Sequence, residues 1–156
     1  MAAVHVAVIG GTEIVAEVAS AAEEVGRLLA GRGAVVVCGG REGVAEAACR
    51  GAFEAGGTTV GILPGRTRDE ANPFVSVAVP TGLGETRNAL VVMDADAVIA
   101  FPGAYGTLSE LAFSLLGGTR VVGLGTWRLD EQPGGGEVPI RPASTPAEAV
   151  SLALDH

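Results

Sequence analysis

The feature that most restricts the fold of this chain is a repeated unit in which a short apolar run ends in glycine and is followed by an amphipathic helical pattern. The run 4–9 ends at Gly10, and the run 34–38 ends at Gly39. Runs of this kind are typical of parallel strands that are buried on both faces. Strands that alternate with helices of about 10–15 residues build βαβ units with right-handed crossovers. The chain is therefore predicted to be an α/β protein with a doubly wound, Rossmann-like, mostly parallel sheet and helices on both faces.

The same two patterns place the remaining elements along the chain. We expect helices at 13–30, 44–55, 84–94 and 107–116, and further strands at 58–63, 75–79, 97–101 and 121–124. Residues 126–143 are predicted to be a long polar loop or an edge hairpin. Thr145, Pro146 and Glu148 have the spacing of a capping box that opens a last helix. Because 156 residues is near the usual size of one domain and no linker interrupts them, residues 1–156 are predicted to form a single domain.

The composition excludes several classes of function. All ten basic residues are arginine and no lysine is present, so neither a pyridoxal-phosphate Schiff base nor a Walker A phosphate loop can form. The 18 acidic residues are spread along the chain and give a net charge of −8, which argues against a nucleic-acid or anionic-membrane partner. No apolar run approaches the ~18 residues of a membrane helix. The first residues enter a strand pattern without a basic leader, so we expect a cytoplasmic protein.

The cysteines and histidines do not form a set of metal ligands. Cys38 and Cys49 are eleven residues apart, and the two histidines are His5 and His156. These residues do not assemble a zinc ligand set with the usual spacing, so no metal is expected. The two cysteines are predicted to be small buried hydrophobic residues. His5 lies within the first strand pattern and is expected to be a structural residue, which leaves no histidine for a Ser-His-Asp or Cys-His catalytic unit.

Four strand-to-helix turns carry the residues expected to bind a ligand, because the ligand crevice of such a sheet lies beyond the carboxyl ends of its strands. They are 10–12, 39–43, 81–88 and 101–107. Each combines glycines, which let backbone N–H groups approach a ligand, with a helix N-terminus, whose dipole favours negative charge. A phosphate group or a nucleotide is the expected ligand. The candidate binding residues are Gly10, Gly11, Thr12, Gly39, Gly40, Gly43, Arg87, Asn88, Gly103, Ala104, Tyr105, Gly106, Thr107 and Glu110.

Two residues of the last turn have structural alternatives. Thr107 and Glu110 have the spacing of a capping box, in which Glu110 would do no more than accept from a backbone amide at the helix start. Tyr105, the only tyrosine of the chain, lies within the glycine turn, where it would either contact a base or pack against the protein.

The arginines near the turns also have two interpretations. Arg87 lies in the first turn of a predicted helix, where the positive end of the helix dipole disfavours a cation. It is therefore expected to face an anionic ligand, with a salt bridge to Glu85 or Asp94 as the alternative. Arg41 is interpreted as a solvated surface residue.

The segment Phe101-Pro-Gly-Ala-Tyr-Gly-Thr-Leu-Ser-Glu110 resembles the Pro-Gly-Gly-x-Gly-Thr-x-x-Glu signature of the Lonely Guy-like superfamily (SLOG), long labelled "possible lysine decarboxylase". Arg87 stands fifteen residues ahead of Pro102, as the functional arginine of that superfamily does. Segments 37–57, 60–65 and 121–127 are similar to the branch that contains molybdenum-cofactor carrier proteins. The decarboxylase label requires a cofactor-binding lysine, which this chain lacks.

The resemblance implies a binding protein for a nucleotide or pterin-type phosphate, like the molybdenum-cofactor carriers. It would need no resident cofactor and would hold molybdenum cofactor or a nucleotide as its cargo. The alternative is a nucleoside 5'-monophosphate phosphoribohydrolase, in which Glu110 stabilises positive charge on the ribose and Arg87 holds the phosphate. A second alternative is a non-catalytic sensor or scaffold.

Two departures from the superfamily pattern weaken the hydrolase interpretation more than the carrier interpretation. Ala104 stands where the signature has its second glycine, and Asn88 stands where the phosphoribohydrolases commonly carry lysine. The branch also implies a dimer or tetramer, and the apolar helix residues Leu111, Phe113, Leu115 and Leu116 independently predict a homo-oligomer.

Overall fold

A single seven-stranded sheet forms the centre of the molecule in the computed structural model, which describes residues 2–155. Met1 and His156, the latter considered above as a metal ligand, lie outside the described residues. The strands are β1 (His5–Ile9), β2 (Val35–Cys38), β3 (Thr59–Leu63), β4 (Val77–Pro80), β5 (Ala97–Ala100), β6 (Arg120–Gly123) and β7 (Ile140–Pro142). Their order is β4-β3-β2-β1-β5-β6-β7, and every neighbouring pair is parallel.

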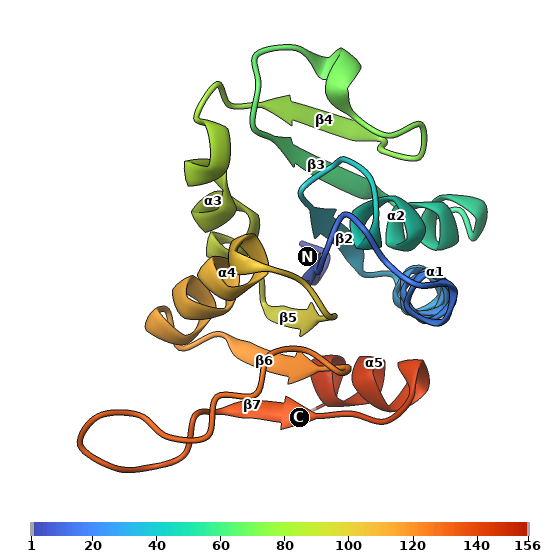
Figure 1. The fold of residues 1–156 in the computed structure, drawn as a ribbon. Helices are drawn as coiled ribbons and strands as arrows, with labels where there is room; N and C mark the ends of the chain where they lie inside the picture. The colour runs from blue at the N-terminus through green and yellow to red at the C-terminus, as the bar shows by residue number, and fades with distance from the viewer. Residues whose placement is uncertain (1, 156) are drawn as a thin grey trace.

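Helices cover both faces of this sheet, as Figure 1 shows. They are α1 (Ala16–Gly31), α2 (Val44–Glu54), α3 (Asn88–Met93), α4 (Tyr105–Leu116) and α5 (Pro146–Leu154), with short 3₁₀ helices η1 (Arg68–Glu70) and η2 (Gly84–Arg87). The helices α1, α2 and α5 lie on one face, and α3 and α4 lie on the other. The predicted doubly wound α/β fold is therefore confirmed. That residues 1–156 form one domain stays a prediction.

The central strand β1 shows why the apolar runs are continuous. Its side chains alternate between the two faces, so Val6 and Val8 join the core beneath α1, α2 and α5, whereas Ala7 and Ile9 join the core beneath α3 and α4. All four are 3% exposed or less. A strand that is buried on both sides cannot carry polar residues at alternate positions, and this produces the run that the sequence shows.

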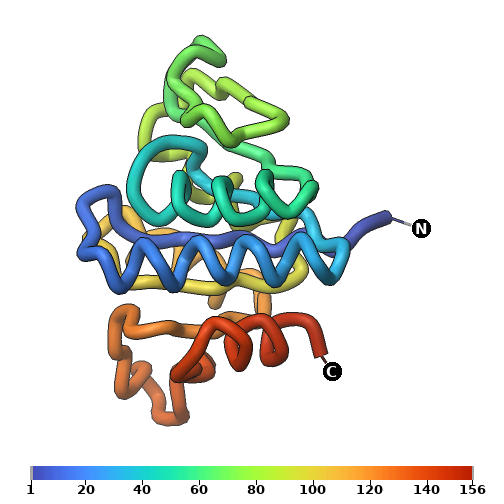
Figure 2. The backbone as a smooth tube through the Cα atoms, turned by 90° about the vertical axis from the view of Figure 1, so that its right-hand side faces the viewer, coloured from blue at the N-terminus to red at the C-terminus, as the bar shows by residue number. Residues whose placement is uncertain are grey.

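The strand order places the ligand crevice beside β1. This strand pairs with β2 on one side and β5 on the other, so the direction in which the chain adds strands reverses there. Ligands of open α/β sheets bind at such a switch point, beyond the carboxyl ends of the strands. Figure 2 shows the turns that follow β1 and β2 at the end of the molecule opposite the two chain termini.

Several predicted boundaries are corrected by the structure. The helix expected at 13–30 begins at Ala16, and the helix expected at 107–116 begins at Tyr105. The segment 84–94 is not one helix, because η2 is followed by the short helix α3. The hairpin alternative for 126–143 is wrong, since β7 pairs with β6 in parallel. The 16 residues 124–139 are enough for the crossover that a parallel pair requires.

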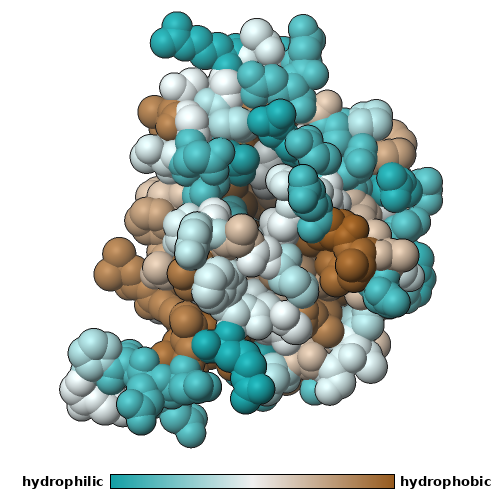
Figure 3. Space-filling model, in the orientation of Figure 1, coloured by the Kyte–Doolittle hydropathy of each residue, from teal (hydrophilic) through white to brown (hydrophobic). Residues whose placement is uncertain are grey.

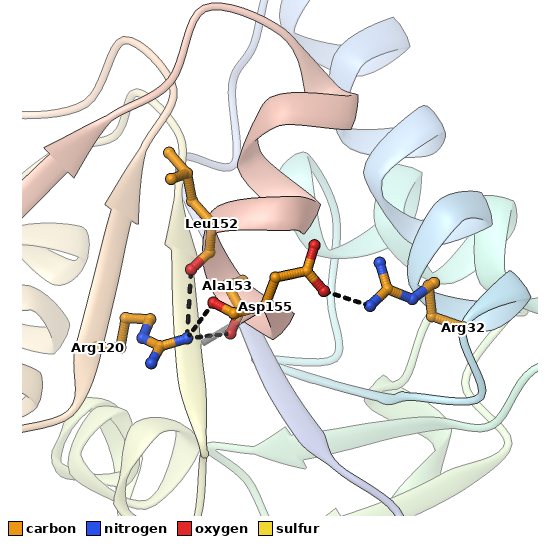
Figure 4. A network of polar contacts seen from close by, with 5 residues as sticks. All are labelled: Arg32, Arg120, Leu152, Ala153 and Asp155. Atoms are coloured by element: carbon orange, nitrogen blue, oxygen red, sulfur yellow. Dashed lines mark hydrogen bonds and ion pairs between the residues drawn. The ribbon is translucent and has the colours of Figure 1, made fainter.

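The last helix, α5, is held at both ends. The side chain of Thr145 accepts from the backbone N–H of Glu148 at 3.1 Å, which confirms the predicted cap. At the other end, Arg120 Nη1 donates to the carbonyls of Leu152, Ala153 and Asp155, as Figure 4 shows. A cation at a helix C-terminus also complements the helix dipole. The arginine of β6 thus fixes α5 against the sheet. Among residues 2–155, no helix combines the length and apolar character needed to cross a bilayer.

Candidate functional site

The four glycine-rich turns meet around one cavity of about 300 Å³. It lies beyond the carboxyl ends of β1, β2 and β5 and is bounded on the far side by η2, α3 and the start of α4. Most of the predicted site residues line it: Gly10, Gly11, Thr12, Gly39, Arg87, Asn88, Ala104, Gly106, Thr107 and Glu110. The structure therefore brings together residues from all four turns, although they are up to one hundred positions apart in the sequence.

Four predicted residues do not line this cavity, and three of them shape the turns instead. Gly40 and Gly43 have positive φ angles of 79° and 77°, which glycine adopts without strain. Gly103 packs so closely against Thr107 that a side chain there would overlap its hydroxyl oxygen. The fourth, Tyr105, is 79% exposed and points outward.

Three charged residues that were not among the candidate binding residues also line the cavity. They are Arg41, Glu42 and Glu85. Arg41 was expected to be a solvated surface residue, but its half-exposed side chain borders the cavity, 3.8 Å from the Glu42 carboxylate. The sequence signal for this placement was its position two residues after Gly39, the glycine that follows β2.

The guanidinium group of Arg87 lies in this cavity, and among residues 2–155 no carboxylate forms an ion pair with it. It crosses the end of β2 so closely that a methyl group on Gly39 would overlap it. Its Nε atom is buried and has no hydrogen-bond partner among the described residues. The alternative salt bridges do not form: no ion pair of Arg87 with Glu85 or Asp94 occurs in the described chain, and Asp94 lies 2.6 Å from His5 Nδ1 instead. An unpaired buried donor costs about 1–3 kcal/mol, so this cation is arranged for a ligand.

Glu110 faces the same cavity from α4 and is 6% exposed. Burial raises the pKa of its carboxyl to about 8; the nearby Arg87 opposes this increase, and Cys38 and Glu85 add to it. With this pKa, only about one in ten of these carboxyls is ionised at neutral pH. Glu110 is therefore mostly a neutral acid in the free protein and is able to donate a hydrogen bond to an anion.

The capping-box alternative for Thr107 and Glu110 is wrong. Helix α4 begins two residues earlier, with Ala104 as its N-cap residue. No side chain caps this end of α4. The first N–H groups of a helix have no partner within it, so those of α4 are available to a ligand at the cavity.

Asn88 and Ala104 occupy the two positions that depart from the superfamily pattern. Asn88 is 5% exposed and its amide nitrogen donates to Ser109 Oγ at 3.2 Å, which joins α3 to the first turns of α4. Ala104 has a φ of −99°, so its methyl group is accommodated without the left-handed backbone that would require glycine. One donor of the Asn88 amide is thus used to join the two helices while the residue also lines the cavity, and Ala104 leaves the turn intact.

Cys38 and Cys49 are both buried, as predicted, and their Sγ atoms lie 3.4 Å apart without a bond. The contact with Cys49, and then burial, raise the pKa of the Cys38 thiol. Within residues 2–155, no group of three or more His, Cys, Asp and Glu side chains is placed to hold a metal ion.

The comparison with known families gives one match over most of the chain. Residues 3–149 match the SLOG cluster4 family. The curated cytokinin riboside 5'-monophosphate phosphoribohydrolase of Mycobacterium tuberculosis is 37% identical over 99 residues, which cover 62% of this chain and 53% of that protein. The matched part thus spans about half the length of this curated relative.

Solved structures show a similar fold over nearly the whole chain. The molybdenum cofactor binding protein from Rippkaea orientalis has a TM-score of 0.87 and 32% identity, with 97% of this chain and 96% of that chain covered. The molybdenum cofactor carrier protein from Chlamydomonas reinhardtii has a TM-score of 0.81 and 29% identity, with 96% and 95% covered.

Proposed function

The chain belongs to the SLOG cluster4 family, and from this premise we propose that it is a binding protein for a nucleotide or pterin-type phosphate, similar to the molybdenum-cofactor carriers. The observation that carries the proposal is the buried Nε atom of Arg87, which has no hydrogen-bond partner among the described residues, beside the uncapped N-terminus of α4. A cation and free backbone N–H groups at one cavity form a site for an anionic group. The ligand's phosphate binds there, and its ring system lies toward the rim.

The protonation state of the Glu110 carboxyl favours ligand binding over hydrolysis. Cleavage of an N-glycosidic bond places positive charge on the ribose, and an ionised carboxylate stabilises that charge. Burial keeps most of the Glu110 carboxyl neutral at pH 7, and a neutral acid next to a phosphate donates a hydrogen bond instead. The phosphoribohydrolase remains the second candidate because of the similarity to the Mycobacterium tuberculosis protein.

Two measurements on the same samples test the proposal. Thermal unfolding is followed with AMP, GMP or molybdenum cofactor, and each nucleotide incubation is assayed for free base and ribose 5-phosphate. A ligand at about 100 times its Kd adds about 2.7 kcal/mol to the free energy of unfolding, so Tm should rise clearly. A higher Tm without product supports the carrier. Base release that is abolished in Glu110→Ala identifies a hydrolase. An unchanged Tm with every ligand contradicts both and favours the sensor or scaffold.

The exposed apolar face of α3 and α4 leads us to propose a homo-oligomer as well. Met93 is 71%, Phe113 44% and Leu116 84% exposed, and Figure 3 shows apolar side chains gathered on the left edge over α4. Leu111 is not part of this face, because it is buried against the sheet.

We expect a dimer or tetramer in sedimentation at micromolar concentration and a monomer for Leu116→Glu. The matched change Val15→Glu, 62% exposed on the opposite side of the sheet, should leave assembly unchanged. A wild-type monomer would contradict the expectation.

The protein would act in the cytoplasm on a phosphorylated small molecule, without a resident cofactor or metal. Its net charge of −8 makes nucleic acid and anionic membranes poor partners.

A further inference from the structure

A stacked pair of aromatic rings lies beside the turn 101–107 that borders the cavity, although neither ring lines the cavity itself. Tyr105 stacks on Trp127 with ring centroids 6.1 Å apart and planes 27° from parallel. The indole is fixed in place, since Trp127 Nε1 donates to the carbonyl of Ala104 at 3.2 Å. Tyr105, in contrast, keeps 79% of its surface exposed to solvent. Tyr105 thus presents an ordered aromatic face, backed by the half-buried Trp127, that the fold itself does not cover.

The pair is continuous with the cavity through the chain. Ala104 and Gly106, the two neighbours of Tyr105, both line the cavity, and the hydrogen bond from Trp127 ends on Ala104. At about 300 Å³ the cavity is at the lower end of the range for ligand pockets. A phosphorylated sugar is of a size to enter it, and a ring system attached to that sugar would lie outside the cavity, where Tyr105 is exposed next to two lining residues.

We infer that Tyr105 and Trp127 form a stacking platform for the planar heterocycle of a ligand whose phosphate group binds beside Arg87. This inference rests on the proposed binding function and adds the residues that recognise the ring. Aromatic faces stack on any base, so the platform provides affinity for planar heterocycles as a class. The phosphate group fixes the ligand in the cavity, and the platform separates nucleotide-like ligands from simple sugar phosphates.

Trp127 makes the test direct because it is the only tryptophan of the chain. GMP and ribose 5-phosphate are titrated separately, with tryptophan emission and calorimetry recorded together. GMP should quench the emission, whereas ribose 5-phosphate should bind without quenching. Tyr105→Ala should weaken GMP binding by about fivefold to hundredfold, the range that stacking gives, and leave ribose 5-phosphate binding unchanged. Tyr105→Phe should restore GMP affinity, since it keeps the ring.

Phe53→Ala is the matched control, because Phe53 is an exposed aromatic residue of α2 that packs edge-on against a second ring, Phe74, and does not line the cavity. It should alter neither affinity. The inference is overturned if Tyr105→Ala weakens both ligands equally, which would mean that it disturbs the rim, or if GMP binds without quenching. It is also overturned if the emission depends on protein concentration and not on GMP, since a second copy then covers the rings. If neither ligand binds, the proposed function fails together with the platform; if only ribose 5-phosphate binds, the platform alone fails.

Discussion

Arg87→Ala is expected to weaken the binding of nucleoside monophosphates at least thirtyfold. The guanidinium faces the cavity, and its buried Nε atom has no hydrogen-bond partner among residues 2–155, so its hydrogen bonds and charge are available to the ligand's phosphate. Truncating one member of a buried, charged, hydrogen-bonded pair costs about 2–5 kcal/mol, and 1.4 kcal/mol is a tenfold change in Kd. Calorimetric titration with GMP measures the loss. Arg87→Lys should recover only part of the affinity, because an ammonium group cannot bind phosphate in a bidentate manner.

The same substitution should have the opposite effect on the ligand-free protein. The Nε atom of Arg87 is buried without a hydrogen-bond partner in the described part of the chain, which opposes folding. The free energy of unfolding of Arg87→Ala should therefore stay the same or rise, as is common when a binding group is removed. Chemical denaturation without ligand measures this. If Arg87 serves binding, its removal lowers ligand affinity without lowering the free energy of unfolding. If Arg87 is structural, its removal lowers the free energy of unfolding.

Arg68→Ala provides the matched control. Arg68 is an exposed arginine of η1 that does not line the cavity, so its removal changes the net charge equally. It should leave GMP affinity within a factor of about two, as expected for a screened surface charge. Equal losses of affinity in the two variants would show that only the overall charge of the protein attracts the ligand. A marked loss of stability in Arg87→Ala would show that the residue is structural.

The fold and the position of the site were predictable because both depend on local patterns. The run 4–9 is apolar at every position that must face a helix layer, and parallel pairing then brings the turns after β1, β2 and β5 to one edge. For Arg41, the position two residues after Gly39 was the one sequence signal, and it did not decide whether the side chain borders the cavity. Whether it borders the cavity depends on how the turn after β2 folds over the end of β1, which is a tertiary property.

The error at the start of α4 has a physical explanation. Thr107 and Glu110 have capping-box spacing, but the spacing is compatible with two helix starts. The turn after β5 packs against the first turn after β1, with the Gly11 N–H donating to the Pro102 carbonyl at 2.8 Å. That contact fixes the chain early enough for α4 to begin at Tyr105. Glu110 is consequently further along the helix and turned toward the cavity, and long-range contacts of this kind have no local signal.

Glu110→Gln is expected to make the ligand-free protein more stable at alkaline pH by up to about 5 kcal/mol. The pKa of Glu110 is raised from its ordinary 4.5 to about 8 in the folded protein, chiefly by burial. Above about pH 4.5 the unfolded chain releases the proton while the folded chain retains it, so the wild type loses stability as the pH rises toward 8. Beyond pH 8 both states are ionised and the loss is complete. A shift of this size corresponds to about 5 kcal/mol, and glutamine does not ionise at all.

Urea unfolding of both proteins at about pH 5 and about pH 9 measures this difference, which should grow toward the alkaline end. Glu13→Gln, the same substitution at an exposed position outside the cavity, should show the pH dependence of the wild type. Glu110→Gln should also retain GMP binding at neutral pH, because the amide donates the hydrogen bond that the neutral acid donates. An equal pH dependence of wild type and Glu110→Gln would instead mean that Glu110 is ionised and solvated at pH 7. The carboxylate would then be available to stabilise a developing positive charge, and the hydrolase would become the better explanation of this site.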